Sequence, residues 1–297
     1  MEKQASDRVI LRRGRERKEN VLPGTPDLRG PNTWAGTARP YAMSFAHLCA
    51  GTIAPLLDAV EGAVGALAGK RLADVGCGTG TLAALAAGRG AHVTAIDPDA
   101  EMLSLARAAA PEADLRVGAV PTLPFEPSTF DAVVANFVVN HVGQPRAAMA
   151  DLARICSPGG VVGVTVWPAE PSAINALWAA VVRASGAWTL PHQHLAAELD
   201  FERTQRGLAG LLTEAGLTRV RGATISWEFR IDPDDLWAGP AGGVAGIGRI
   251  VSSQTPATRS IMRREYERLI SPMIRDGQLV LPAVALLATG RAPGSAQ

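Results

Sequence analysis

The stretch from Arg71 to Gly80, RLADVGCGTG, constrains the fold more than any other part of the sequence. Its apolar first residues suit a short buried strand, and glycine then stands at every second position before the helix-forming run LAALAA begins at Leu82. Glycine tolerates positive φ and lets a ligand lie against bare backbone. The N-terminus of the following helix offers unpaired N–H groups. The pattern therefore predicts a strand, a glycine turn and a helix, with a polar small molecule bound over the turn.

Strand and helix patterns alternate from residue 71 to residue 167, which is typical of a doubly wound parallel sheet. The run AHVTAID is predicted as the second strand, and it ends at Asp97. In such a sheet the carboxyl ends of the strands face the ligand crevice. A carboxylate at this point can accept two hydrogen bonds from ribose hydroxyls. The alternative is that the aspartate only caps the next helix.

The spacing of the glycines separates two classes of nucleotide ligand. The dinucleotide fingerprint is G-x-G-x-x-G, whereas here the third glycine comes one residue early, at Gly80, and Asp74 precedes the first. The sequence also lacks a Tyr-x-x-x-Lys pair. Both observations argue against an NAD(P)-dependent oxidoreductase, which stays as an alternative function.

The segment DVGCGTG resembles motif I of the class I S-adenosylmethionine (SAM) methyltransferases, in their small-molecule branch. The LPF turn at Leu123 to Phe125, the pair Phe130–Asp131 and the turn from Ser157 to Gly160 match the same family, and the resemblance covers residues 45–166. It implies an α/β fold with a doubly wound, Rossmann-like, seven-stranded sheet, parallel with an antiparallel last strand. It also implies SAM as cofactor and S-adenosylhomocysteine as product.

The resemblance assigns roles around the cofactor. It implies that the glycine loop holds the amino-acid end of SAM, that Asp97 binds the ribose, and that Pro98 and Met102 flank the adenine. Ala119 stands where the family usually has an acid that reads the adenine amino group, so a backbone carbonyl or apolar contact must replace it. The candidate cofactor-binding residues are Tyr41, Asp74, Gly76, Cys77, Gly78, Thr79, Gly80, Asp97, Pro98, Met102, Ala119, Val120, Asn136, Phe137 and His141.

A proton acceptor is needed only if the methyl acceptor must lose a proton. His141 matches a frequent histidine just beyond the fourth strand of the family, where it could act as base or orient the acceptor, or merely fix the turn into the next helix. Tyr41 either contacts SAM or packs between helices. The pattern H-x-H lacks a third ligand, so no metal is expected. The candidate catalytic residues are His141, His192, His194 and Tyr41.

The chain divides into five regions by composition and by this resemblance. Two helices, broken around Gly51 and Pro55, are expected before the glycine loop. The regions are a flexible basic N-terminal arm (1–33), a helical cap (34–68), the SAM-binding Rossmann-like core (69–167), an acceptor-binding insertion (168–206), and the C-terminal part of the core sheet with inserted helices (207–292). The arm is expected to be solvated, or else to close over the site or swap between subunits.

Tryptophans mark the expected acceptor pocket. Trp178 and Trp188 lie in the insertion together with two histidines, and Trp237 lies in a later glycine-rich segment that is expected to sit beside it. The alternative is a surface loop with solvated histidines. This apolar, tryptophan-bearing composition favours an aromatic or terpenoid-like acceptor over a charged polymer.

Overall composition excludes several partners. The net charge is +1 and 47% of the residues are hydrophobic, so no strong field points to nucleic acid or to a membrane surface. No apolar run approaches a membrane span, and no signal peptide opens the sequence. The three cysteines have no metal spacing, and their odd number suits a reducing cytoplasm. We expect a cytoplasmic monomer or homodimer.

These observations predict a SAM-dependent methyltransferase that acts on a small apolar or aromatic acceptor in secondary metabolism, in natural product biosynthesis. The sequence leaves open whether carbon, oxygen or nitrogen is methylated. Besides the oxidoreductase, a non-catalytic SAM-binding module remains an alternative.

Overall fold

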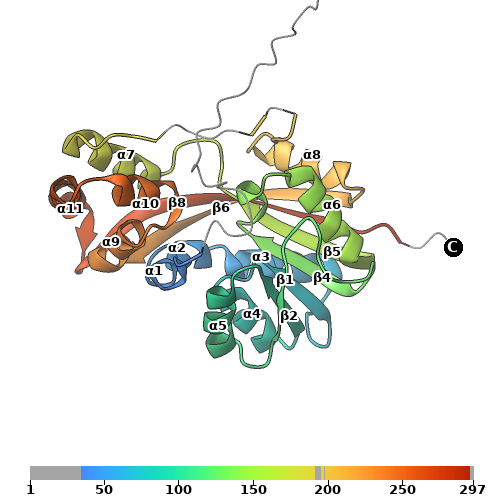
Figure 1. The fold of residues 1–297 in the computed structure, drawn as a ribbon. Helices are drawn as coiled ribbons and strands as arrows, with labels where there is room; N and C mark the ends of the chain where they lie inside the picture. Colours follow the sequence, from blue (N-terminus) through green and yellow to red (C-terminus); the bar gives the residue numbers. More distant parts are fainter. Residues whose placement is uncertain (1–34, 191–194, 197, 295–297) are drawn as a thin grey trace, which may run out of the picture.

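The computed structural model describes residues 35–190, 195–196 and 198–294, so the predicted basic arm lies outside the described residues. Its centre is one sheet with the strand order β3-β2-β1-β4-β5-β8-β6 (Figure 1). Strands β1 to β5 are parallel, and β8 lies antiparallel between β5 and β6. The strands are β1 (Arg71–Val75), β2 (His92–Asp97), β3 (Asp114–Val117), β4 (Phe130–Asn136), β5 (Cys156–Val166), β6 (Thr218–Ile231), β7 (Ile274–Arg275) and β8 (Gln278–Arg291).

This order confirms the doubly wound, Rossmann-like sheet with an antiparallel last strand. Among the described residues, the two-residue strand β7 pairs with β8 and brings the sheet to eight strands, one more than expected. The helices are α1 (Ala38–Met43), α2 (Phe45–Ala50), α3 (Ile53–Val64), α4 (Thr81–Gly88), α5 (Ala100–Ala109), α6 (Pro145–Ile155), α7 (Ala173–Ser185), α8 (Gln205–Glu214), α9 (Pro233–Ala241), α10 (Ala245–Ser253) and α11 (Pro256–Ile270).

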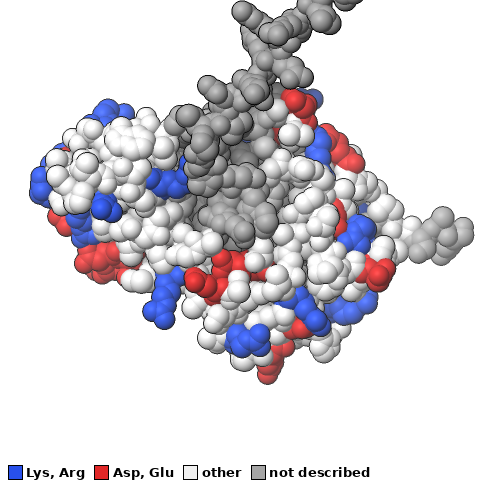
Figure 2. All heavy atoms as spheres, viewed as in Figure 1, with Lys and Arg blue, Asp and Glu red and all other residues white. Residues whose placement is uncertain are grey.

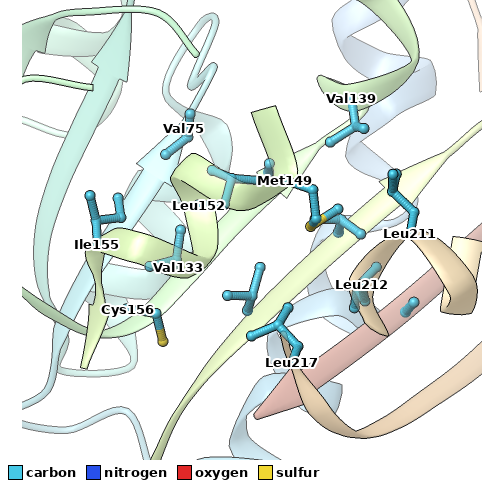
Figure 3. Close-up of a cluster of buried hydrophobic side chains, with 14 of the residues drawn as sticks. Val75, Val133, Val139, Met149, Leu152, Ile155, Cys156, Leu211, Leu212 and Leu217 are labelled. Atoms are coloured by element: carbon cyan, nitrogen blue, oxygen red, sulfur yellow. The ribbon is translucent and has the colours of Figure 1, made fainter. Parts of the chain in front are cut away.

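The central strands are apolar throughout because both faces of the sheet are covered. Successive residues of β4 enter opposite cores: Val133 packs with α6 and α8, whereas Val134 packs with α3, α4 and α5. Figure 3 shows the first of these cores, with Met149 and Leu152 of α6 beside Leu212 of α8. The sheet is therefore the middle layer of three, which leaves its strand ends as the place for a site.

A third apolar cluster forms a helical lobe from α7, α9, α10, α11 and the outer halves of β6 and β8. Figure 1 shows these helices gathered at one end of the molecule, away from α6 and α8. Strand β8 serves both parts, because Leu281 packs in the lobe and Ala288 packs in the sheet core. None of the helices among the described residues is long and apolar enough to cross a membrane.

The cap before β1 differs from the sequence prediction. It has three helices instead of two, because the chain breaks at Ser44 as well as between Gly51 and Thr52. Pro55 does not break a helix, since it lies in the first turn of α3. A proline there removes no hydrogen bond, because the N–H groups of the first turn have no partner within the helix.

The predicted turn from Ser157 to Gly160 was wrong, because these residues lie inside β5. The pairing of β4 with β5 shifts between Phe130 and Ala132, so the segment bulges within the strand. A Cβ on Gly160 would stand 2.7 Å from the carbonyl oxygen of Asp131, which explains why glycine is needed there. The described surface in Figure 2 carries acidic and basic side chains interspersed, in line with the net charge of +1.

Candidate functional site

The glycine loop after β1 is held in place by backbone geometry. Gly76, Gly78 and Gly80 all have positive φ, of 70°, 51° and 82°. The N–H groups of Gly76 and Cys77 both donate to the carbonyl oxygen of Ile96, at 2.7 and 3.0 Å, so the loop is tied to β2. A Cβ on Gly80 would stand 2.7 Å from the Cα of Ala106, so only glycine lets α4 start this close to α5.

Asp97, the last residue of β2, supports this loop. One carboxylate oxygen accepts from the N–H of Gly78 at 2.9 Å, and the other accepts from the N–H of Asp99 at 2.9 Å. Burial raises the pKa of Asp97, and these two hydrogen bonds oppose that rise. The neighbouring Asp99 caps α5, because its side chain accepts from Glu101 and Met102. Helix capping therefore belongs to Asp99, and the Asp97 carboxylate lies at the wall of the cavity described below.

Asp74 lies beneath the loop and does not line the cavity. It is 1% exposed, and burial, helped by the charge of Asp97, raises its pKa to about 7 despite a backbone hydrogen bond from Ala83. Within the described part of the chain, its Oδ2 atom has no hydrogen-bond partner. Asp74 therefore supports the start of α4 from below.

A cavity of about 440 Å³ opens over the carboxyl ends of the strands. Such a volume falls in the usual range for small-molecule sites, roughly 300–1,000 Å³. Its walls come from the glycine loop, the ends of β2, β4 and β5, the cap and the helical lobe. The described lining residues are Tyr41, Phe45, Leu48, Cys49, Val75, Gly76, Gly78, Asp97, Pro98, Met102, Gly118, Ala119, Val120, Asn136, Phe137, Val138, His141, Val142, Trp167, Pro168, Glu170, Ser172, Ile174, Asn175, Val244 and Ala245.

Charge is scarce in this cavity. Among the described lining residues the carboxylates are Asp97 and Glu170, and none is Lys or Arg. Glu170 is exposed, whereas Asp97 is buried beside the loop. The site is therefore suited to a ligand with polar hydroxyl groups at the loop and to an uncharged, apolar ligand elsewhere.

Tyr41 of α1 lies against the glycine loop. Its ring atom Cε1 is 3.7 Å from where a Cβ on Gly78 would stand. Burial, followed by its contact with Cys49, raises the Tyr41 pKa well above the usual value. Burial likewise raises the pKa of the Cys49 thiol to about 12, against a hydrogen bond with Tyr41. Both groups stay protonated at neutral pH, which argues against the predicted role of Tyr41 as a proton acceptor.

The end of β4 and the end of β5 build an aromatic wall. The rings of Phe137 and Trp167 are stacked, with centroids 3.9 Å apart and planes 16° apart. Phe137 is 5% exposed and has a positive φ of 57°. That conformation is a genuine outlier for a bulky residue, so the surrounding contacts must hold it. We call this stacked pair the aromatic platform.

His141 ends the 3-10 turn Val139–His141 after β4. It is exposed, and it lines the cavity as the sequence suggested. His192 and His194, the other predicted catalytic histidines, lie outside the described residues. No group of three or more His, Cys, Asp or Glu that could hold a metal occurs among the described residues.

The predicted cofactor-binding residues are divided by the structure. Eleven of the fifteen line the cavity: Tyr41, Gly76, Gly78, Asp97, Pro98, Met102, Ala119, Val120, Asn136, Phe137 and His141. The other four, which shape the loop from behind, are Asp74, Cys77, Thr79 and Gly80.

The prediction that Trp178, Trp188 and Trp237 line the acceptor pocket was wrong. Trp178 and Trp237 pack around Tyr266 inside the helical lobe, where apolar burial draws them away from the cavity. Trp188 is 53% exposed and does not line the cavity either.

The sequence analysis missed several lining residues. Trp167 directly follows the apolar run of β5, so the rule that ligands bind at the carboxyl ends of strands could have identified it. Ile174, Val244 and Ala245 reach the cavity only because the lobe folds over it, and no local signal marks them.

Comparison with known proteins identifies the central segment. Residues 73–164 match the family model described as a methyltransferase domain. A demethylmenaquinone methyltransferase of Renibacterium salmoninarum is 39% identical over 101 residues, 34% of this chain and 43% of the relative. A ubiquinone/menaquinone biosynthesis C-methyltransferase of Rubrivivax gelatinosus is 28% identical over 170 residues, 54% of this chain and 67% of the relative.

Structural comparison agrees on the fold. A solved structure from Bacillus halodurans, described as a candidate methyltransferase, has a TM-score of 0.52 at 17% identity and covers 81% of this chain and 98% of its own. Among the sequence relatives, the matched region spans less than half of the Renibacterium protein. The family match therefore concerns residues 73–164, which leaves the helical lobe beyond β5 outside it.

Proposed function

We propose that this chain, in which residues 73–164 form a class I SAM-dependent methyltransferase domain, methylates a small, uncharged, apolar or aromatic acceptor. The observation that carries the proposal is the cavity itself. It has the glycine loop and the Asp97 carboxylate on one side and the aromatic platform on the other. We further propose that residues 69–167 bind SAM and that the cap and the helical lobe enclose the acceptor.

The residues present fit SAM. Gly78, at a positive φ of 51°, presents bare backbone to the cavity beside the Tyr41 ring, and the amino-acid part would lie against it. Asp97 keeps lone pairs that can accept from ribose hydroxyls beyond its two backbone bonds. Met102, Ala119 and Val120 would contact the adenine without a side-chain acid. When bound, SAM supplies an electrophilic methyl group on a sulfonium.

The chain's own part in the reaction is to position the acceptor and to exclude water. Holding two reactants in line can lower a barrier by roughly 7–11 kcal/mol. The scarcity of charge suits a step in which the sulfonium loses its charge. If the acceptor is a hydroxyl, His141 would take its proton, typically a factor of about 10²–10⁴ in rate.

The lining favours an uncharged ring as acceptor. An anionic acceptor would find no Lys or Arg among the described lining residues, and a flat ring can stack on the platform. The names of the relatives, a demethylmenaquinone methyltransferase and a Xylella fastidiosa ubiquinone biosynthesis O-methyltransferase that is 40% identical over 99 residues, also point to quinone-type rings. We propose that the acceptor is a compound of secondary metabolism.

The test is direct. The full chain is incubated with radiolabelled SAM and a panel of 1-naphthol, catechol, benzoate and a primary alkylamine, and S-adenosylhomocysteine is measured. We expect turnover with the neutral rings and none with benzoate, and slower turnover in His141→Gln if a hydroxyl is methylated. Binding of NADH without binding of SAM would overturn the proposal in favour of an oxidoreductase. SAM binding with no turnover of any acceptor would favour a non-catalytic module.

A further inference from the structure

We infer that a buried hydrogen-bond network of Thr52, Asn136 and Thr165 positions the aromatic platform and fastens the cap to the sheet. The inference rests on the proposed function, since it assigns these residues to the acceptor side of that site. It revises the sequence prediction for Asn136, whose side chain is engaged with the protein itself.

The network lies where β4, β5 and the cap meet. The Oδ1 atom of Asn136 lies 2.5 Å from the hydroxyl of Thr165 and 2.7 Å from the hydroxyl of Thr52. Its Nδ2 atom donates to the carbonyl oxygen of Cys49 at 3.1 Å. Both threonines are 0% exposed, so these bonds form away from water. One side chain thus joins the neighbouring strand to the junction between α2 and α3.

The protons of the network can be assigned. Thr165 donates its hydroxyl proton to Asn136 and accepts the N–H of Phe137 at 3.1 Å. The single hydroxyl proton of Thr52 is shared between Asn136 Oδ1 and the carbonyl oxygen of Cys49, which lies at 2.9 Å. Each buried hydroxyl therefore has a partner, which a polar group in an apolar core requires.

The network explains the strained conformation of the platform. The N–H of Phe137 donates to two oxygens of Thr165, the carbonyl oxygen and the hydroxyl, each at 3.1 Å. A bulky residue persists at positive φ only when its surroundings hold it there. The stack of Phe137 on Trp167 follows from that conformation, so the hydroxyl of Thr165 acts on the acceptor surface through Phe137.

The other arm reaches the cap. Asn136 and Thr52 hold the carbonyl of Cys49, and the Cys49 side chain contacts Tyr41, whose ring lies over Gly78. The network therefore connects the acceptor platform with the cap that covers the loop. The donor contacts of Asp97 and the glycine loop lie outside the network, so its loss should affect the two ligands unequally.

The experiment compares Thr165→Val and Thr52→Val with a matched control, Thr289→Val. Thr289 is likewise buried in the sheet, at 4% exposure, but it pairs with Gly163 and Arg221 away from the cavity. Calorimetry measures S-adenosylhomocysteine binding, and then 1-naphthol binding to that complex, for the full chain and each variant.

We expect Thr165→Val to weaken 1-naphthol binding about five- to tenfold, as one lost buried hydrogen bond would. Binding of S-adenosylhomocysteine should change by less than about twofold, and Thr289→Val should match the wild type in both. Thr165→Ser, which keeps the hydroxyl, should restore 1-naphthol binding. The double variant Thr52→Val/Thr165→Val should lose less than the product of the single losses, since both hydroxyls act on one oxygen.

Two results would overturn the inference: equal 1-naphthol affinities in Thr165→Val and Thr289→Val, or equal weakening of both ligands by Thr165→Val. Thr52→Val removes the other hydroxyl that donates to Asn136 Oδ1, so it carries the test if Thr165→Val does not fold, and a 1-naphthol affinity equal to that of Thr289→Val would then overturn the inference. A wild-type chain that binds neither ligand contradicts the proposed function itself. One that binds S-adenosylhomocysteine but not 1-naphthol contradicts the ring acceptor and, with it, this role of the network.

Discussion

The two sides of the cavity are built by different means. The donor side, the glycine loop with Asp97, is held by hydrogen bonds from the backbone N–H groups of the loop to β2, such as that from Gly76 to the carbonyl oxygen of Ile96 and that from Gly78 to the carboxylate of Asp97. The acceptor side is held by side chains from distant segments, through the packing of residues such as Trp167 and Ile174 and through the hydrogen bonds of Asn136. One side can therefore stay the same while the other changes its lining.

This difference gives each side its own sensitivity. Backbone conformation tolerates few substitutions, so changes on the donor side should be severe and should affect SAM. Side-chain packing tolerates changes that keep volume, so changes on the acceptor side should be moderate and should affect the acceptor. The following predictions test that separation, from the largest expected effect to the smallest.

Gly80→Ala should have the largest effect. The residue has a φ of 82°, and its new Cβ would meet the backbone of Ala106. The left-handed conformation alone costs an alanine about 1–2 kcal/mol, and the clash adds to it. We expect loss of S-adenosylhomocysteine binding and a lower free energy of unfolding, measured by calorimetry and urea unfolding. Gly210→Ala, in α8 with open space around it, is the control and should be neutral or slightly stabilising.

Asp74→Asn should change how stability depends on pH. The pKa of Asp74 is about 7 in the folded chain and about 3.9 when unfolded, so the folded state holds more protons between these values. The free energy of unfolding therefore falls as pH rises through this window, and the whole penalty is present above it. Asparagine removes this contribution, so the variant should gain on the order of 2 kcal/mol relative to wild type between pH 5 and pH 8.

Urea unfolding at the two pH values measures this gain. Asp131→Asn is the control of opposite sign, because hydrogen bonds from Arg71 lower the pKa of Asp131. That carboxylate is ionised in both states above pH 5, so its loss should lower stability equally at both pH values. An unchanged pH slope in Asp74→Asn would show that the pKa of the Asp74 carboxyl is not raised in the folded chain.

Trp167→Leu should have the smallest of these effects and should spare the donor side. Leucine keeps apolar volume but removes the stacked surface against Phe137, so we expect 1-naphthol affinity to fall about tenfold, or about 1.4 kcal/mol. S-adenosylhomocysteine affinity should stay within about twofold. Trp188→Leu, at an exposed tryptophan outside the lining, is the control for both titrations. Equal weakening of both ligands would mean that the two sides are not separate.

The same contrast explains what the sequence could predict. The loop from Gly76 to Gly80 and the strand ending at Asp97 depend on local patterns, and the structure places them as expected. The acceptor side depends on contacts far apart in the chain. The composition of a segment does not show whether its tryptophan packs in a core, as Trp178 does, or lines a cavity, as Trp167 does.

The network of Asn136 was beyond sequence reasoning for the same reason. Its partners Thr52 and Thr165 stand 84 and 29 residues away, and only the crossing of the cap over β4 and β5 brings them together. Conversely, the predicted break at Pro55 was wrong because a proline breaks a helix only beyond the first turn, and the sequence alone does not show that α3 begins at Ile53.

Calorimetric titration of S-adenosylhomocysteine into the wild type, Asp97→Asn and Asp99→Asn tests the central claim most directly. In Asp97→Asn one acceptor oxygen becomes a donor, so we predict at least about tenfold weaker binding, the effect of a lost hydrogen bond to a charged group. Asp99→Asn keeps its helix cap and should bind like the wild type. Wild-type affinity in Asp97→Asn, or no binding by the wild type, would contradict a donor site built on the glycine loop and Asp97.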